Sequence, residues 1–350
     1  MDINLFDYNL PDELIAQYPT PNRDESKLLI LNRTTDETNI RSFQSIIEYL
    51  TPGDALVVNN TRVFKARLIG NRISGGKVEV FLVRKSGNKE LLWKALARPS
   101  RRLKEGEKVY FDKTSLDNRN YLVLQKKMTG DKWLVEFNSI QSREDIIDNY
   151  GHVPLPHYIR RPDSTDDINR YQTIFARTDK TGAVAAPTAG IHFTELIIDQ
   201  LKEKGVNIVE LTLHVGPGTF QPVIVDNIDN HNIDPEYAAL SPDAANILNN
   251  VRNAGGKVFA VGTTSVRTLE SAQIDNNNIA SFCHEVDLYI KPGFKFKIVD
   301  HLITNFHLPK SSLLILVSAF SGREKILKAY RTAIENNFRF YSYGDAMLIL

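Results

Sequence analysis

A helix followed by a strand, with a glycine-containing loop on each side, spans residues 182–223 and constrains the fold more than any other stretch. Apolar and polar residues alternate along the strand, which places Thr212 and His214 on the face opposite the apolar side chains. The helix has a capping residue, an apolar stripe and a glycine suited to a left-handed stop. These signals are Thr194, then Leu196, Ile197 and Leu201, then Gly205, and in the strand Val209, Leu211, Leu213 and Val215. Together they predict an α/β unit.

The two loops around this helix–strand pair are candidates for a binding site. Residues 187–193 precede the helix, whose free N–H groups can receive an anion. Residues 216–220 form a sharp turn just past the carboxyl end of the strand, where ligands usually lie in α/β sheets. One such loop alone is more often an ordinary connection. Two of them, each with a histidine and an aromatic residue within or beside it, favour a site.

Strands and helices alternate through much of the chain. Continuous apolar runs predict buried strands at 27–31, 55–58 and 258–261, the last leading into a helix over 266–271. We also predict a strand at 313–317, a capping box at 321–324 for the helix that continues to Ile334, and a strand at the carboxyl end. The predicted fold class is therefore α/β, with a mixed, partly parallel sheet.

Residues 63–150 have a different pattern, in which short strands are separated by glycines. The strands are predicted at 78–84, 91–97, 108–111, 121–126 and 132–137, a spacing typical of a small antiparallel barrel or sandwich. We therefore predict a discontinuous α/β catalytic domain, residues 1–62 and 151–350, with a β-barrel-like domain inserted at 63–150. One loop of the insert carries four cations, which in most proteins are merely solvated. They are Arg98, Arg101, Arg102 and Lys104.

Composition bears on where the chain works. Cys283 is the single cysteine of 350 residues, which excludes an internal disulfide and fits a reducing cytoplasm. The longest apolar run, 313–320, is too short to span a bilayer, and the acidic amino terminus predicts no secretory signal. The net charge of +1 makes no prediction about nucleic acid, which would have to meet a local basic patch. We expect a cytoplasmic protein with no membrane partner.

Several segments resemble, in the same order, the QueA family of S-adenosylmethionine:tRNA ribosyltransferase-isomerases of queuosine synthesis. The segments are VVNNTRVFKARLIG, VPLPHYI, AAPTAGIHFT, LTLHVGPGTFQPV, VGTTSVRTLE, NFHLPKSSLLILVSAFSGRE and FRFYSYGDAMLIL. The resemblance runs from the first residues to the last. The chain departs from the family pattern at His157, where a second proline is usual, and at Asp234, where a histidine is usual.

The resemblance implies an unusual reaction. The ribosyl part of S-adenosylmethionine moves to a 7-aminomethyl-7-deazaguanine in the wobble position of tRNA and isomerises to an epoxycyclopentane, giving epoxyqueuosine, while adenine and methionine leave. The expected partners are thus S-adenosylmethionine and a tRNA carrying this precursor. S-adenosylmethionine is a consumed substrate, so we expect neither a cofactor nor a metal, and we expect a monomer. Such an enzyme must hold the methionine carboxylate and the sulfonium, move protons and receive an unpaired base.

The resemblance and the residue types together give the candidate site. His192, His214 and His307 are the candidate proton carriers, because imidazole titrates near neutral pH. Glu270 lies one helical turn beyond Arg267 and is expected to orient it. The substrate-binding candidates are Thr188, Gly190, Phe193, Gly216, Gly218, Thr219, Phe220, Thr263, Thr264, Arg267, Glu270 and Asn305. The tRNA-binding candidates, chosen as cations that can meet phosphates, are Arg98, Arg101, Arg102, Lys104, Arg160 and Arg161. We expect the loops around His192, Gly218, Thr264 and His307 to converge on one hollow.

Two other function classes stay open. A metal-dependent hydrolase would use Glu236 with a set of histidines, although the sequence has no tight pair such as HExxH. The histidines are His192, His214, His231 and His307. A non-catalytic RNA-binding protein would grip RNA with the barrel, but polar loops at several strand ends argue against a mere scaffold in the α/β part. Neither the dinucleotide pattern GxGxxG nor the P-loop pattern occurs in the sequence.

Overall fold

A nine-stranded sheet forms the centre of the larger part of the molecule. The computed structural model describes residues 1–87, 89–111, 120–220 and 222–350, and for Phe220 the backbone alone. In spatial order the strands are β18 (Phe282–Val286), β14 (Glu236–Leu240), β13 (Asn207–Leu213), β3 (Ala55–Asn59), β15 (Val258–Val261), β19 (His301–Asn305), β20 (Ala346–Ile349), β1 (Lys27–Leu31) and β2 (Thr38–Ser42). The four central strands β13, β3, β15 and β19 run parallel, and so do β20 and β1. The other neighbours are antiparallel, so the predicted mixed, partly parallel sheet is confirmed.

Helices cover both faces of this sheet. The helices α5 (Pro242–Asn253), α6 (Gly262–Ser271), α7 (Ser312–Ser321) and α8 (Arg323–Glu335) share one core with the strands, and α1 (Ile46–Tyr49) and α4 (Glu195–Glu203) share the other. In β3, Ala55 and Val57 point into the first core, whereas Leu56 and Val58 point into the second. Burial on both faces explains why the central strands read as continuous apolar runs.

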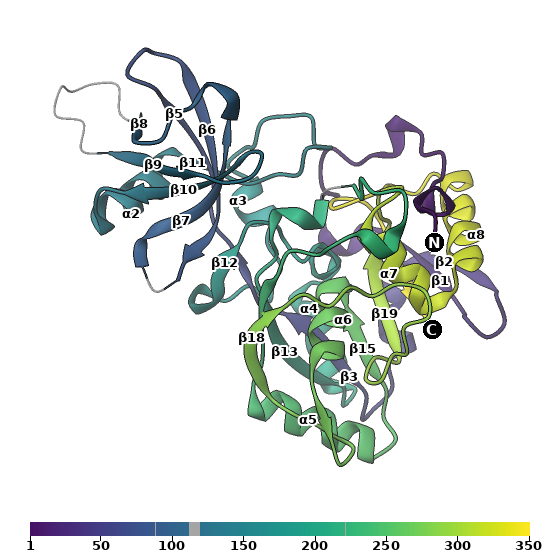
Figure 1. Cartoon of the computed structure of the whole chain (residues 1–350). Helices are drawn as coiled ribbons and strands as arrows, with labels where there is room; N and C mark the ends of the chain where they lie inside the picture. The colour runs from purple at the N-terminus through teal and green to yellow at the C-terminus, as the bar shows by residue number, and fades with distance from the viewer. Residues whose placement is uncertain (88, 112–119, 221) are drawn as a thin grey trace.

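A closed antiparallel barrel lies at one end of the molecule (Figure 1). Its six strands are β5 (Arg67–Asn71), β6 (Lys77–Ser86), β7 (Lys89–Arg98), β10 (Lys132–Phe137), β9 (Tyr121–Lys127) and β8 (Glu107–Tyr110). The barrel closes where Asn71 of β5 pairs with Tyr110 of β8. The fully buried Trp133 fills its interior together with Phe137 and the apolar residues of the other strands. The predicted inserted antiparallel barrel is therefore confirmed.

Short elements connect the barrel to the sheet. After the barrel, α2 (Ile140–Tyr150) leads into β11 (Gly151–His152), which pairs with β5. Strand β4 (Arg62–Val63), just before the barrel, pairs in parallel with β12 (Thr181–Ala183). Apart from short 3-10 helices, the other described elements are α3 (Asp167–Arg170), β16 (Ile274–Asp275) and β17 (Asn278–Ile279).

Residues 313–317 are helical, and the predicted strand there is wrong. They belong to α7, whose N-cap Ser311 accepts a hydrogen bond from the Leu314 N–H at 3.2 Å. A helix buried on most sides and a buried strand both read as unbroken apolar runs, so the sequence pattern alone does not separate them. Within the described part of the chain, no helix is long and apolar enough to cross a membrane.

Three helix predictions need correction in their details. Ser321 belongs to α7, and α8 follows Gly322, whose φ is +92°, without a side-chain cap, so the predicted capping box is absent there. Helix α6 begins at Gly262, four residues before the predicted start. In α4, Thr194 caps the helix as predicted, but Leu196 is 64% exposed. The buried side of α4 consists of Ile197, Ile198 and Leu201, because the sheet lies on that side.

Candidate active site

Two cavities open beyond the carboxyl ends of the parallel strands. These ends lie at one edge of the sheet because β13, β3, β15 and β19 are neighbours that run in the same direction. The smaller cavity, here called the hydroxyl pocket, has a volume of about 50 Å³. The larger one, here called the cleft, has a volume of about 1040 Å³ and lies between the barrel and the sheet. Val215, Thr219 and Leu313 line both cavities, so the two adjoin at these residues.

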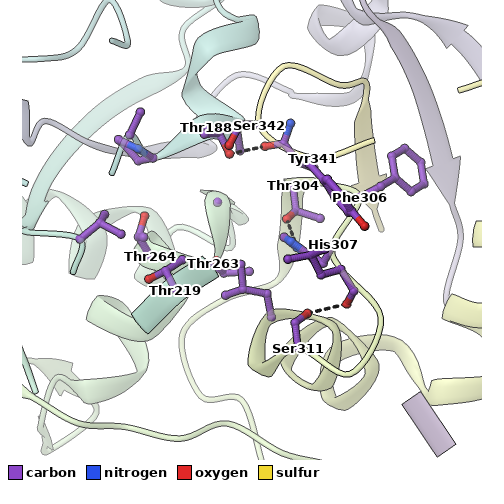
Figure 2. Close-up of a pocket in the computed structure, with 18 of the residues that line it drawn as sticks. Thr188, Thr219, Thr263, Thr264, Thr304, Phe306, His307, Ser311, Tyr341 and Ser342 are labelled. Atoms are coloured by element: carbon purple, nitrogen blue, oxygen red, sulfur yellow. Dashed lines mark hydrogen bonds between the residues drawn. The ribbon is translucent and has the colours of Figure 1, made fainter. Parts of the chain in front are cut away.

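The polar side chains in the wall of the hydroxyl pocket are all neutral and come from segments far apart in the sequence. Thr219, Thr263 and Thr264 lie on one side of it, and Thr304, His307 and Ser311 on the other (Figure 2). Its further polar lining residues are Tyr158, Thr188, Asn305, Tyr341 and Ser342. The predicted loops around Thr264 and His307 thus meet in this pocket, and residue 219 brings in the glycine loop after β13.

The start of α6 provides free donors at the hydroxyl pocket. Val261 caps this helix without a side-chain hydrogen bond, and the next residues, Gly262 to Thr264, line the pocket. The buried Thr264 Oγ1 has no hydrogen-bond partner among the described residues. Unpaired N–H groups at a helix start together with a hydroxyl suit the carboxylate of a ligand.

His192 lies behind the hydroxyl pocket and lines neither cavity. Its Nδ1 is 2.8 Å from the Ser26 hydroxyl, and its Nε2 accepts a hydrogen bond from Asn305 Nδ2 at 3.0 Å. Asn305 in turn accepts from the Thr188 hydroxyl at 2.9 Å. Burial, with smaller contributions from the charges of Arg339 and Arg23, lowers the pKa of His192 to about 3. His192 is therefore neutral, and it holds Asn305 and Thr188 at the pocket wall.

His307 faces the hydroxyl pocket directly. Its Nε2 lies 2.9 Å from the Thr304 hydroxyl, and its backbone N–H donates to the Tyr330 hydroxyl at 3.0 Å. The Nδ1 atom makes no hydrogen bond to any residue that the structure describes. Burial lowers the pKa of His307 to about 3, so the ring is neutral and can exchange a hydrogen bond with a ligand.

His214 lines the cleft. Its Nδ1 is 2.8 Å from the Thr61 hydroxyl, and its ring stacks on Tyr237 with centroids 5.1 Å apart and planes 20° apart. Gly182 lies against the ring, where a Cβ would come within 2.8 Å of it. Burial, with a smaller effect of the Lys180 charge, lowers the pKa of His214 to about 4. The ring is thus fixed and neutral, and Nε2 makes no hydrogen bond within the described part of the chain.

Aromatic rings form one wall of the hydroxyl pocket, a feature that the sequence interpretation missed. Tyr158 and Tyr341 pack with ring centroids 4.6 Å apart, and the Tyr158 and Ser342 hydroxyl groups share a hydrogen bond. Tyr341 has a φ of +72°, which is rare for a residue of its size and is often found at functional sites. The motif FRFYSYGD contained these residues, but no local pattern placed them beside residues 188 and 264.

Arg267 pairs with Glu236 and not with Glu270, so the predicted role of Glu270 is wrong. The Glu270 carboxylate accepts the backbone N–H groups of Lys297, Ile298 and Val299 at 2.9 to 3.0 Å. In the described part of the chain these three N–H groups have no strand partner, and the carboxylate accepts their hydrogen bonds instead. Glu236, weighed earlier only as part of a metal site, contacts Arg267 at the wall of the cleft.

Some predicted residues lie at neither cavity. Phe193 is fully buried against Phe43 and Phe175, so its ring does not face a ligand. Gly190 packs on Thr173, where a Cβ would come within 2.8 Å of the threonine methyl. By contrast, Gly216 and Gly218 line the cleft. The predicted role of the Phe220 side chain lies outside the described residues.

The cations predicted to meet tRNA are dispersed. Arg98 lines the cleft and pairs with Asp131 at 3.1 Å. Arg101, Arg102 and Lys104 are exposed on the barrel loop and do not line the cleft. Arg160 pairs with Asp12 on the surface. Arg161 makes two contacts of 2.7 and 2.8 Å with Asp167, so its guanidinium is already occupied by an ion pair within the protein.

The barrel wall of the cleft carries further cations that the sequence interpretation missed. Arg84 pairs with Glu285, and the Lys132 ammonium lies 3.3 Å from the Asp234 carboxylate. These two ion pairs connect the barrel wall of the cleft to its opposite wall, on the side of the sheet. Lys94 makes no ion pair with any described residue. Lys85 also lies on this wall, beside the predicted Arg98. Because the strands of a barrel alternate inward and outward side chains, only the closed fold shows which cations face the cleft.

The histidines required by a metal-dependent hydrolase are not gathered. In the described ranges, no group of three or more His, Cys, Asp or Glu side chains is placed to hold a metal ion. His192, His214 and His307 each bond to a different set of hydroxyl or amide groups.

Residues 3–349 match the family described as queuosine biosynthesis protein. Curated relatives include the S-adenosylmethionine:tRNA ribosyltransferase-isomerases of Halothermothrix orenii and Geotalea uraniireducens, each 46% identical to this chain, with all of both chains covered. The crystal structure of an S-adenosylmethionine tRNA ribosyltransferase from Thermotoga maritima is similar at 34% identity with a TM-score of 0.56. That alignment covers 99% of this chain and 100% of the other.

Proposed function

The chain belongs to the queuosine biosynthesis protein family and acts as a tRNA ribosyltransferase-isomerase, and we propose that its two substrates meet where the hydroxyl pocket joins the cleft. In this reaction the ribosyl part of S-adenosylmethionine moves to 7-aminomethyl-7-deazaguanine at the tRNA wobble position. Epoxyqueuosine forms, and adenine and methionine leave. The single observation that carries this arrangement is the shared lining of the two cavities by Val215, Thr219 and Leu313.

The methionine end of S-adenosylmethionine occupies the hydroxyl pocket. At about 50 Å³ the pocket is much smaller than the ~300–1,000 Å³ typical of a pocket that encloses a whole ligand. Only one end of S-adenosylmethionine therefore enters it. The carboxylate is placed at Thr263 and Thr264, at the open start of α6. The sulfonium lies near Tyr341, whose ring face attracts a cation. The ribose and adenine then extend past Thr219 into the cleft.

The cleft receives the wobble base and the adjoining tRNA backbone. Its volume of about 1040 Å³ is sufficient for a nucleotide extruded from the anticodon loop. Lys94 is available to phosphates, and the ion pairs of the other barrel-wall cations, Arg84, Lys85, Arg98 and Lys132, can be exchanged for phosphate contacts. His214 is the proton carrier at this junction, since its Nε2 is free and its ring is held in place.

The enzyme consumes S-adenosylmethionine as a substrate and uses neither a metal nor a further cofactor. It works as a monomer, because one chain forms both cavities, and in the cytoplasm, where its tRNA substrate is found.

Release of free adenine tests the function. Purified protein is incubated with S-adenosylmethionine and a tRNA that carries the aminomethyl precursor, with and without a chelator. Adenine is expected only when both substrates are present, and to the same extent with chelator. Binding of the tRNA without adenine release would favour the non-catalytic RNA-binding alternative, and loss of activity with chelator would favour a metal-dependent reaction.

A further inference from the structure

Arg267 and Glu236 form a buried ion pair in the wall of the cleft, with side-chain exposures of 8% and 7%. The guanidinium donates through Nη1 to Glu236 Oε2 and through Nε to the Leu288 carbonyl at 3.2 Å. Glu236 Oε1 accepts the Gly216 N–H at 2.6 Å. The pair therefore ties α6 and β14 to the glycine loop that separates the two cavities.

One nitrogen of this pair has no partner among the described residues. Arg267 Nη2 is buried and makes no hydrogen bond to any residue that the structure describes. Buried donors are almost always paired in folded proteins, because an unpaired one loses its hydrogen bonds to water without replacement. Each carboxylate oxygen of Glu236 accepts one hydrogen bond from the protein and has a second lone pair left. Both residues line the cleft, so its wall contains an unpaired donor next to a carboxylate acceptor.

We propose that this pair reads the edge of the target base, with Arg267 Nη2 donating to the ring carbonyl oxygen and Glu236 accepting from the ammonium of the aminomethyl arm. This role rests on the proposed function and adds a specificity determinant to it. The two groups that are read lie next to each other on 7-aminomethyl-7-deazaguanine. The carbonyl is common to that base and to guanine, whereas the ammonium is not.

Unmodified guanine does not match the pair. It presents two adjacent acceptors, N7 and O6, at the same edge. Arg267 would still meet O6, but the Glu236 carboxylate would face the N7 lone pair. Glu236 therefore selects the modified base, and Arg267 binds either base. Glu236 and His214 line the same cavity, so the arm that Glu236 binds enters the cleft that His214 also faces.

Anticodon stem-loops that differ only in the wobble base test this assignment. Three probes are used, bearing 7-aminomethyl-7-deazaguanine, the neutral 7-cyano analogue, or guanine. Binding is titrated at one fixed salt concentration, so that the phosphate contacts are equal among the probes. Wild-type protein is expected to bind the aminomethyl loop at least about tenfold more tightly than the other two.

Variants separate the two side chains. Glu236→Gln is expected to lose most of the preference for the aminomethyl loop, and Arg267→Gln to weaken all three loops by a similar factor. Glu107→Gln is the matched control, since Glu107 also pairs with an arginine, Arg72, but lines neither cavity. It should keep the wild-type preference.

Two results would overturn the assignment. One is a Glu236→Gln protein that is folded, by circular dichroism, and keeps the wild-type preference. The other, which needs no variant, is wild-type protein that binds the aminomethyl and cyano loops equally. Either result leaves the proposed function standing if wild-type protein still releases adenine, whereas absence of adenine release would contradict the proposed function itself.

Discussion

The hydroxyl pocket and the cleft share three lining residues but are built in different ways. The pocket is small, has apolar side chains and neutral polar groups but no charged side chain in its wall, and is formed only by residues outside the barrel. The cleft is about 1040 Å³, has cations on its barrel wall, and is bridged by the ion pairs of Arg84 and Lys132. Neutral hydrogen bonds are insensitive to salt, whereas contacts between cations and phosphates weaken as salt rises. The two substrates should therefore respond differently to the same changes.

The proton chemistry is assigned to the cleft, and His214→Ala is expected to have the largest effect. Adenine release should fall by about 10²–10⁴-fold, the usual contribution of a general acid or base. S-adenosylmethionine and tRNA should still bind, as measured by equilibrium titration. His284→Ala, which removes an exposed histidine that lines neither cavity, should turn over like wild type. If His307→Ala stops the reaction and His214→Ala does not, the chemistry belongs to the hydroxyl pocket.

Acid should destabilise the protein through the histidines at and behind the hydroxyl pocket. The pKa values of His192 and His307 are lowered by burial to about 3, so below the unfolded pKa of ~6.5 the unfolded state binds more protons than the native state. Stability is thus lost as the pH falls from about 6.5 towards 3. Each histidine should contribute a loss of about 1.4 kcal/mol between pH 7.5 and 5.5.

Urea unfolding at these two pH values measures that loss. Wild-type protein should lose about 3 kcal/mol through these two histidines and a similar share per residue through His214, whose pKa is lowered to about 4. His307→Gln should therefore lose about 1.4 kcal/mol less than wild type. An equal loss in the two proteins would show that His307 does not remain neutral in the native state.

Thr264→Val should affect one substrate only. It removes a buried hydroxyl without a partner in the described chain, and S-adenosylmethionine should bind about tenfold more weakly, as for one lost hydrogen bond to a charged group. Isothermal titration should give the same ratio of wild-type to variant affinity for S-adenosylmethionine at low and at high salt. The affinity for tRNA should not change. Thr268→Val, one turn further along α6 and outside both cavities, is the matched control. A tRNA defect in Thr264→Val would contradict the separation of the two cavities.

Lys94→Ser should have the smallest effect, confined to tRNA. Removing one phosphate contact weakens binding a few-fold and reduces the slope of log affinity against log salt by about 1. The double variant Arg101→Ser with Arg102→Ser tests the exposed barrel loop in the same assay, with Lys202→Ser on the distant α4 as a control. If the double variant flattens the slope and Lys94→Ser does not, the tRNA backbone follows the outer loop and not the cleft.

Much of the site follows from loop positions, but its chemistry depends on packing. Thr188, Gly216, Gly218, Thr219, Thr263, Thr264, Arg267, Asn305, His214 and His307 were predicted and do line one of the two cavities. Their catalytic and binding roles stay predictions, as do the domain boundaries at residues 62 and 150. His192 and Phe193 carried the same local signals, yet one supports Asn305 and the other lies in the core. Residues at a loop alternate between the cavity and the layer beneath it, and only the fold shows which is which.

The sequence by itself determined the architecture, because apolar periodicity and glycine spacing are local properties that do not depend on distant contacts. It also determined the family, since its motifs occur in order along the whole chain. Tertiary structure alone decided three things: that Glu236 pairs with Arg267, that Tyr341 faces residues 188 and 264, and that Lys94 faces the cleft. Each of these joins residues that are distant in sequence, and such contacts are set by how strands and helices pack, which no local pattern encodes.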